Sequence, residues 1–340
     1  MSSSLKRGIC PDWLITKQPK KTVIDILLAI VGIALVIYGA DKFTDGSVAL
    51  ARKFSISEMV IGLTVVAFGT SLPEFVVSLM ASLEGSAPLS VGNIVGSNLF
   101  NTLMIVGVTA AIAPIAVRKS TIYKDIPFTL LASVMLATFA LDHIVDGGTV
   151  ENLLSRSDGI ALLGFFCVFM AYTFAIAKPR AGQTPTSSAD VFPLWKMALF
   201  IVGGLAGLVA GGELFVRGAS GVARSLGVSE AVIGLTLVAG GTSLPELATS
   251  IVSARKGQSG IAIGNVIGSN LFNIFWILGV CSTITPMPIE GLTIVDFSVL
   301  IGSGVLFLFF ARTEHRVVSW EGFTLVAIYL FYLGWLIYNL

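Results

Sequence analysis

Long apolar stretches dominate this chain, and short polar connections separate them. Ten stretches are long enough to cross about 30 Å of hydrocarbon as helices. They lie near 23–43, 57–83, 89–114, 126–141, 159–177, 195–216, 229–254, 261–284, 292–311 and 320–338. The pattern therefore predicts an all-α polytopic membrane protein with ten transmembrane helices.

Polar segments divide the ten stretches into two groups of five. Residues 1–22 form a polar N-terminal tail with five basic residues, and residues 178–194 form a linker rich in Pro, Gly, Ser and Thr. The linker separates a first five-helix repeat, 23–177, from a second, 195–340. The first apolar stretch is too long for the core of a cleaved signal peptide, so we expect a retained span.

The two halves are copies of one another. A shift of 172 residues aligns Glu58–Gly107 with Glu230–Gly279 without a gap, and 26 of these 50 positions are identical. Each half has an odd number of spans, so the second copy enters the membrane from the opposite side. This predicts inverted-topology repeats, whose corresponding residues meet near the bilayer midplane.

Composition agrees with a membrane protein. Hydrophobic residues make up 55% of the chain, charged residues 12%, and the mean hydropathy is +0.90, which excludes a soluble domain. The net charge of +1 gives no support for nucleic-acid binding. Thirteen of the 21 Lys and Arg residues fall on the side opposite the termini. The positive-inside rule therefore predicts that the thirteen-residue side is cytoplasmic and that both termini face outward.

The segment Gly69–Glu74, with the sequence GTSLPE, recurs as Gly241–Glu246. Pro73 lacks an amide hydrogen, and its ring clashes with the carbonyl four residues earlier, so the helix must break or kink there. The pattern thus predicts broken helices 2 and 7 at the midplane. We expect nearby backbone carbonyls, including those of Ala67 and Ala239, to lose helical partners and to serve a bound cation.

The repeated segment brings oxygen atoms together. Glu74 lies one helical turn after Thr70, so both side chains can face one space, and the second copy repeats this arrangement. Such an all-oxygen set suits hard cations such as sodium and calcium. Two carboxylates suit either one divalent ion or several monovalent ions, as ion exchange requires. The predicted donors are Thr70, Ser71, Glu74, Thr242, Ser243 and Glu246, with the carbonyls of Ala67 and Ala239.

A second duplicated motif lies in the next span of each half. Gly96–Asn101 reads GSNLFN, and Gly268–Asn273 repeats it. Its glycines permit close helix packing, and its Ser and final Asn share one helical face. We interpret the final asparagines, Asn101 and Asn273, as ion contacts. Helix-to-helix hydrogen bonding is the favoured interpretation of the others, with ion contact as the alternative: Asn93, Asn98, Asn265 and Asn270.

Two further acids correspond between the repeats. Asp41 and Glu213 lie near the ends of the first and sixth spans. An acid there could recruit cations, but pairing with Lys42 or Arg217 at the membrane interface is the favoured interpretation.

These motifs resemble the sodium/calcium exchanger branch of the calcium/cation antiporter superfamily. The paired alpha repeats of that family carry Gly-Thr/Ser-Ser-x-Pro-Glu/Asp followed by Gly-Ser-x-x-x-Asn/Asp, in the order found here. The resemblance extends over essentially the whole chain, including the two inverted halves of five spans. The large cytoplasmic loop of animal exchangers is missing, which is typical of a prokaryotic-type member.

The resemblance implies four ion sites at the midplane. Glu74 and Glu246 match the acids that bind calcium, and Asn101 and Asn273 match the remaining central positions. An asparagine at 273 also favours potassium independence. The other positions match further ligands, the serines those of flanking sodium sites: Thr70, Thr242, the carbonyls of Ala67 and Ala239, Ser71, Ser97, Ser243 and Ser269.

We therefore expect an electrogenic sodium/calcium antiporter that works by alternating access, with the first and sixth spans as the moving pair. Its partners are sodium and calcium ions and the lipid bilayer, with no cofactor and no obligate protein partner. Proton/calcium exchange on the same fold and a cation channel are the alternatives. An enzyme is disfavoured, since the chain has no Ser/His or Cys/His set and no His-Glu-x-x-His motif.

Overall fold

The computed structural model describes residues 19–147, 151–177, 192–228, 233, 237 and 239–338. Among these, eight continuous helices are long and apolar enough to cross a membrane, and a ninth span is the pair Glu58–Thr70 and Leu72–Leu83, bent by 48°. The seventh predicted span, 229–254, lies outside the described residues in most of its first half. The predicted all-α membrane fold is confirmed. Residues 1–18 of the predicted tail and 178–191 of the predicted linker lie outside the described part.

The first repeat begins with one long helix, which is followed by a broken span. Its elements are α1 (Pro19–Lys53), α2 (Glu58–Ile61), the π-helical segment η1 (Gly62–Val66), α3 (Ala67–Thr70), α4 (Leu72–Leu83), α5 (Ala87–Leu99), η2 (Phe100–Ile105), α6 (Val106–Ile112), β1 (Ile115–Ala116), η3 (Thr121–Asp125), α7 (Ile126–Ala140), η4 (His143–Gly147), β2 (Leu153–Leu154) and α8 (Arg156–Ala177).

The second repeat follows the same order. Its described elements are α9 (Leu194–Ser225), α11 (Ala239–Thr242), α12 (Leu244–Arg255), α13 (Ser259–Leu271), the π-helical segment η6 (Phe272–Leu278), α14 (Gly279–Ile284), β3 (Met287–Pro288), α15 (Ile294–Thr313), β4 (Arg316–Val317) and α16 (Ser319–Tyr338).

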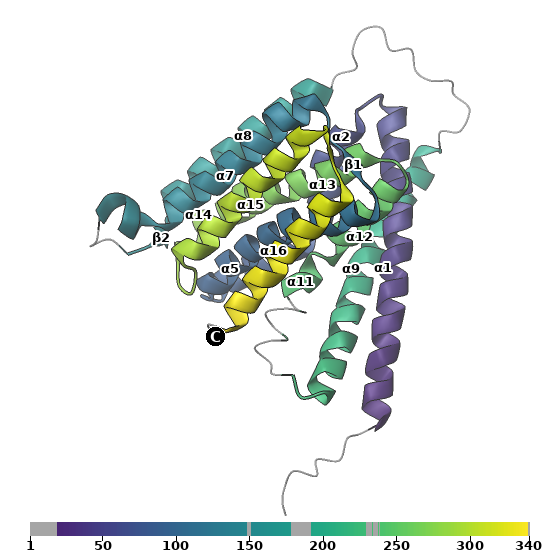
Figure 1. Ribbon diagram of the computed structural model, residues 1–340, viewed down its shortest axis with the longest axis horizontal. Coiled ribbons are helices and arrows are strands. Elements are labelled where there is room, and N and C mark those ends of the chain that lie inside the picture. The colour runs from purple at the N-terminus through teal and green to yellow at the C-terminus, as the bar shows by residue number, and fades with distance from the viewer. Residues whose placement is uncertain are drawn as a thin grey trace, which may run out of the picture.

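Helices α1 and α9 form an antiparallel pair that projects beyond the other helices (Figure 1). They contain 35 and 32 residues, more than the roughly 20 that a span requires. Glycines let the two backbones touch: a Cβ on Gly39 would lie 2.7 Å from the Gly204 carbonyl oxygen, and one on Gly211 would lie 2.8 Å from the Val36 nitrogen. The pair is therefore packed as one unit.

The spans Pro88–Ile112 and Ser259–Ile284 form the centre of the molecule, with 78% and 94% of their apolar windows buried. Helices α1, α8, α9 and α16 are only 17–22% buried, as expected of helices that face lipid. Small residues allow the central crossing, because a Cβ on Gly264 would meet the Gly62 Cα atom at 2.9 Å. The close approach predicted for the motif glycines is confirmed in the second repeat, at Gly264 and Gly268. It is wrong for Gly96 in the first repeat, where an added Cβ would meet none of the described atoms within 4 Å.

Two short antiparallel β-bridges connect the repeats. Strand β1 pairs with β4, with Ile115 opposite Val317, and β2 pairs with β3, with Leu154 opposite Met287. Each bridge joins one strand of the first half to one of the second. The repeats are thus interlocked at both bridges, a feature that the apolar pattern did not predict.

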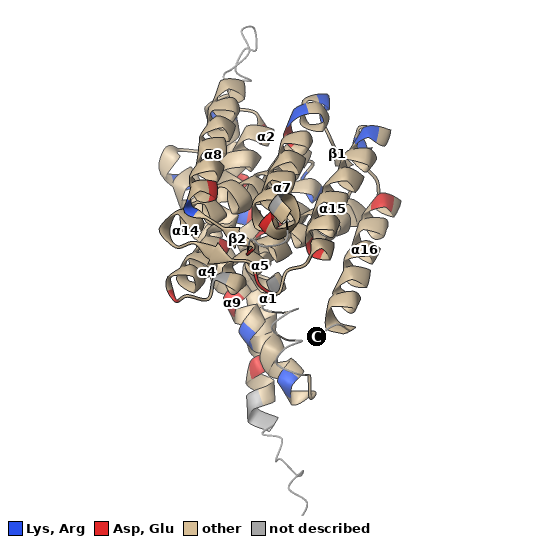
Figure 2. Cartoon of the chain, turned by 90° about the vertical axis from the view of Figure 1, so that its left-hand side faces the viewer, with Lys and Arg blue, Asp and Glu red and all other residues tan. Residues whose placement is uncertain are grey.

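Charged residues gather at the ends of the helices. Figure 2 shows Lys and Arg above α7 and beside β1, at one end of the bundle. Three basic residues lie in or next to the β1–β4 bridge in the sequence: Arg118, Lys119 and Arg316. This is the side assigned to the cytoplasm from the sequence, and the orientation of the termini stays a prediction.

Candidate cation site at the broken helices

Both repeats break at the same point of the GTSLPE segment. Helix α3 ends at Thr70 and α4 begins at Leu72, with Ser71 between them at φ −83° and ψ 6°. In the second repeat Ser243 occupies the equivalent point at φ −90° and ψ 8°. In both copies proline stands in the first turn of the following helix, where its missing N–H costs nothing. The predicted kink at Pro73 is confirmed.

The expectation that the Ala67 carbonyl loses its helical partner is wrong. Its oxygen accepts the Ser71 N–H at 3.0 Å and the Thr70 hydroxyl at 3.4 Å. Pro73 has no N–H to donate to the carbonyl four residues earlier, which is that of Gly69. The Ala67 carbonyl accepts instead from the N–H of Ser71, so the proline does not affect its bond. A carbonyl oxygen has two lone pairs, so Ala67 can still serve a cation while it holds this helical bond.

The two glutamates belong to one site. Glu74 is 0% exposed and Glu246 is 1% exposed. The Ser243 hydroxyl donates to Glu74 Oε1 at 2.9 Å, and the Ser71 hydroxyl donates to Glu246 Oε1 at 3.1 Å. Each acid is therefore held by the serine at the helix break of the opposite repeat. This reciprocal exchange brings the two broken helices face to face.

Neighbouring hydroxyls complete the surroundings of the acids. Ser269 donates to Glu246 Oε1 at 3.5 Å, and the Thr242 side chain interacts with Glu74. Thr70 is fully buried and donates to Asn265 Oδ1 at 3.0 Å. Asn265 in turn donates to the Glu246 carbonyl at 3.2 Å, so it ties the two broken helices together.

Four asparagines form a second layer across the repeats. Asn101 donates to Asn270 Oδ1 at 3.1 Å, and Asn273 donates to Asn98 Oδ1 at 2.9 Å. The motif that follows the helix break in one repeat is therefore hydrogen-bonded to its copy in the other. Helix-to-helix bonding, the favoured interpretation of Asn98 and Asn270, is confirmed.

Several oxygens of this site are buried without a hydrogen-bond partner within the described residues. They are Glu74 Oε2, Glu246 Oε2, Asn101 Oδ1, Asn273 Oδ1 and Ser97 Oγ. Buried polar atoms are costly without partners, and four of these five are acceptors that carry no hydrogen. A cation satisfies such acceptors, whereas an anion cannot.

The donor set fits a hard cation. Across the part of the chain that the structure describes, no three His, Cys, Asp or Glu side chains come together, so a nitrogen or sulfur site for zinc or copper is not formed there. The two carboxylates are accompanied by hydroxyl, amide and carbonyl oxygens instead, as for sodium or calcium. Ala239 opens α11, and its side chain lies outside the described set.

Sequence reasoning missed two features of the site. Asn101 and Asn273 lie in the π-helical segments η2 and η6, and such segments are frequent at functional sites. Asn98 accepts from the Asn273 amide and Asn270 accepts from the Asn101 amide. The sequence predicted contact between helices for Asn98 and Asn270 but not these two partners. Their spacing, three residues before each site asparagine, is the only signal that the sequence offered.

The interfacial acids are paired as predicted. Asp41 and Lys42 form an ion pair at 3.0 Å, and Glu213 pairs with Arg217. Asp41 also pairs at 2.6 Å with Lys256, the residue that follows α12, so the ion pair links α1 to the end of α12.

Comparison with known proteins gives the same family. A model of the family described as "Sodium/calcium exchanger protein" matches residues 24–175 and 196–338, with one segment in each half. The chain belongs to this exchanger family. Its relatives include the putative antiporter CaxA of Alkalimonas amylolytica, 40% identical over 270 residues that cover 78% of this chain and 82% of CaxA. The sodium/calcium exchanger MaX1 of Methanosarcina acetivorans is 32% identical and covers 93% and 99% of the two chains.

Solved structures of this exchanger family have the same fold. The sodium-calcium exchanger NCX_Mj, soaked with sodium and strontium, superimposes with a TM-score of 0.78 at 34% identity. The match covers 92% of this chain and 98% of NCX_Mj. The ten-helix inverted-repeat architecture expected from the sequence therefore agrees with an exchanger of known structure.

Proposed function

We propose that this chain is an antiporter that exchanges sodium ions for calcium by alternating access. The carrying observation is the reciprocal pairing of Ser243 with Glu74 and of Ser71 with Glu246, beside carboxylate oxygens without partners. One buried site therefore holds two acids from inverted repeats. The names of MaX1 and NCX_Mj support sodium and calcium as the exchanged ions.

Exchange follows from competition for the same oxygens. Two carboxylates give the site a charge near −2, which one calcium ion or several sodium ions can balance. Glu74 and Glu246 serve calcium directly, and Asn101 and Asn273 add amide oxygens. The sodium ions share the carboxylate oxygens with calcium and also use the remaining hydroxyl and carbonyl oxygens. Because one set of oxygens serves both ions, neither leaves efficiently until the other replaces it.

The proposal includes a cellular setting. The chain is an integral multi-pass protein, placed in the inner membrane of a prokaryote with its termini outside. It carries ions without enzymatic chemistry and without a bound cofactor. The inner membrane protein YrbG of Escherichia coli, 38% identical over 299 residues that cover 82% of this chain and 86% of YrbG, supports this placement.

Helices α1 and α9 form the moving pair. At one end of the molecule α1 is held to α12 by polar contacts: Thr44 lies 3.2 Å from Ser253 between hydroxyl oxygens, and Lys256 bonds Asp41 and Asp45 at 2.6 Å each. These contacts close that end of the site. Movement of the α1–α9 pair away from α12 opens it.

The repeat-related contact at the other end is built differently. By the shift of 172 residues that relates the repeats, Val216 corresponds to Thr44, Ala81 to Ser253, and Glu84 to Lys256. Glu84 is exposed and makes no ion pair within the described residues, while Arg217, the counterpart of Asp45, is paired inside α9. Inverted repeats exchange their conformations when the transporter switches sides. An Arg217–Glu84 ion pair is therefore expected in the opposite state.

The test is calcium flux into proteoliposomes with sodium, potassium and pH gradients imposed independently. An outward sodium gradient should drive calcium uptake, and a potassium gradient should have no effect. We expect the exchange to be electrogenic, with more sodium charge than calcium charge moved in each cycle, so an inside-negative or inside-positive voltage should change the rate. Uptake driven by a pH gradient without sodium would support proton/calcium exchange instead. Current without counter-transport would indicate a channel.

A further inference from the structure

An asparagine side chain carries an oxygen and an amino group of nearly the same shape, so neighbours must decide which atom faces a cation. Asn101 and Asn273 are both 1% exposed, and each donates its amino group to an asparagine of the other repeat. This arrangement leaves Oδ1 of each residue as the acceptor without a partner in the described chain. The orientation of both amides is therefore set by the residues that accept from them.

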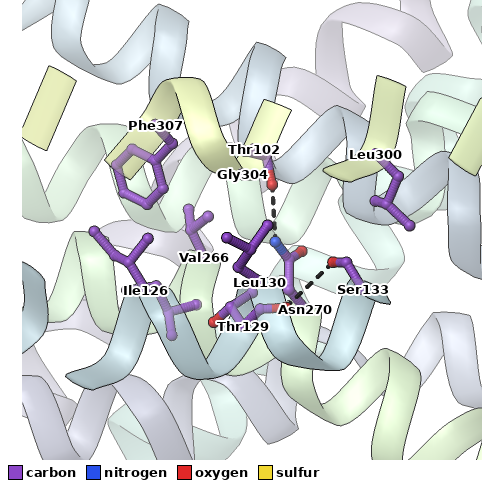
Figure 3. Close-up of a pocket in the computed structure, with 11 residues that line it drawn as sticks. Thr102, Ile126, Thr129, Leu130, Ser133, Val266, Asn270, Leu300, Gly304 and Phe307 are labelled. Atoms are coloured by element: carbon purple, nitrogen blue, oxygen red, sulfur yellow. Dashed lines mark hydrogen bonds between the residues drawn. The ribbon is translucent and has the colours of Figure 1, made fainter. Parts of the chain in front are cut away.

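The accepting asparagines are themselves held in place. Asn270 donates to the Thr102 hydroxyl at 2.9 Å, and Figure 3 shows its amino group directed at Thr102. Asn98 donates to the backbone carbonyl of Asn270 at 3.3 Å. The Asn270 backbone carbonyl can only accept, so Asn98 directs its amino group there and presents its oxygen to Asn273. The Thr102 hydroxyl accepts from Asn270, and Asn270 then presents its oxygen to Asn101.

The two repeats differ at one position of this network. By the shift of 172 residues, Ile274 is the counterpart of Thr102, so the second repeat has no hydroxyl at this position. One accepting asparagine is therefore held by a side chain and the other by backbone. Thr102 is 4% exposed and lines a small pocket with Leu130 and Val266, next to Asn270 (Figure 3). It can be changed without deleting any asparagine.

We propose that Thr102, Asn270 and Asn98 are positioning residues that fix the amide orientation of Asn101 and Asn273, so that both present an oxygen to the transported cation. Thr102 orients Asn270, which orients Asn101, while Asn98 orients Asn273. The inference rests on the proposed function, because it requires a cation at the site. An amide turned the other way would direct its partly positive hydrogens at the cation and weaken binding.

The first test is Thr102→Val, which keeps the shape of the side chain and removes the acceptor for Asn270. Equilibrium binding of calcium to the purified protein should weaken by about tenfold, because the Asn101 amide loses its fixed orientation and only the orientation with its oxygen toward the site binds calcium. Thr102→Ser restores the hydroxyl and should bind calcium like the wild type. Ile274→Val, the matched change at the repeat-related position, should alter calcium affinity by less than about twofold.

The second test separates orientation from packing. In an Asn101→Ala background there is no amide left to orient, so adding Thr102→Val should weaken calcium binding by less than about twofold further. Thermal unfolding without calcium should show that all variants remain folded. In transport, Thr102→Val should raise the calcium concentration for half-maximal uptake and leave the maximal rate nearly unchanged.

Three results would overturn the inference: wild-type calcium affinity in Thr102→Val, equally weak binding in Thr102→Ser, or a full tenfold further loss in the Asn101→Ala background. The wild-type chain is measured first. If it binds calcium but shows no sodium-driven uptake, the proposed exchange fails, and the affinities of the variants still decide the orienting role.

Discussion

Glu74→Gln is expected to abolish sodium-driven calcium uptake, and Glu246→Gln is expected to do the same. Each change removes one of the two buried charges that balance calcium. A unit charge pair at 4 Å contributes about 4 kcal/mol at an effective dielectric constant of 20, so calcium affinity should fall at least about 100-fold. The glutamine carbonyl can still accept from Ser243 or Ser71, so the fold should persist.

The matched control is Glu290→Gln, which makes the same change at an exposed acid in the loop between β3 and α15. It should retain wild-type uptake, because Glu290 lies outside the buried site and outside the contacts between α1 and α12. Calcium binding to purified protein and flux into proteoliposomes measure the effect at both positions. Wild-type uptake by folded Glu74→Gln would remove this acid from the site.

The second large effect concerns the movement of α1. Thr44→Cys combined with Ser253→Cys places two thiols where hydroxyl oxygens now lie 3.2 Å apart, in a background with the native cysteines replaced. Oxidation should join α1 to α12 and stop exchange almost completely, because the site then cannot open at this end. Reduction should restore it. Calcium flux before and after oxidation measures the effect.

Two controls identify the cause of this block. Either single cysteine variant should be insensitive to the oxidant, since no bond can form. Val216→Cys with Ala81→Cys, the repeat-related pair, should also stop exchange when oxidised, by trapping the opposite state. Full transport by a quantitatively cross-linked Thr44–Ser253 pair would show that α1 and α12 do not separate during exchange.

The features predicted well from the sequence are those with local or repeated causes. Pro73 breaks its helix because its ring leaves it without an amide hydrogen, so the GTSLPE segment alone was enough to predict the break. The copy at Gly241–Glu246 and the odd number of spans in each half then implied that the two acids meet. Burial of Glu74 and Glu246 and their reciprocal bonds to the two serines agree with that geometry.

The features that were missed depend on contacts between distant segments. Asn98 and Asn270 acquire their role only because the other repeat places an amide opposite each of them. The β1–β4 and β2–β3 bridges join strands too short to leave a hydrophobic pattern. The prediction that the Ala67 carbonyl loses its helical bond was wrong, because a proline removes only its own N–H hydrogen bond and leaves the neighbouring bonds in place.

The central claim is that two acids from inverted repeats form one site shared by both ions. Its most direct test is calcium binding to the purified wild-type protein, measured by calorimetry over a range of sodium concentrations. The account predicts one high-affinity calcium ion per chain, lost in either Glu→Gln variant and displaced fully by sodium with a dependence steeper than one-to-one. Two independent calcium ions per chain, or calcium that remains bound at saturating sodium, would contradict it.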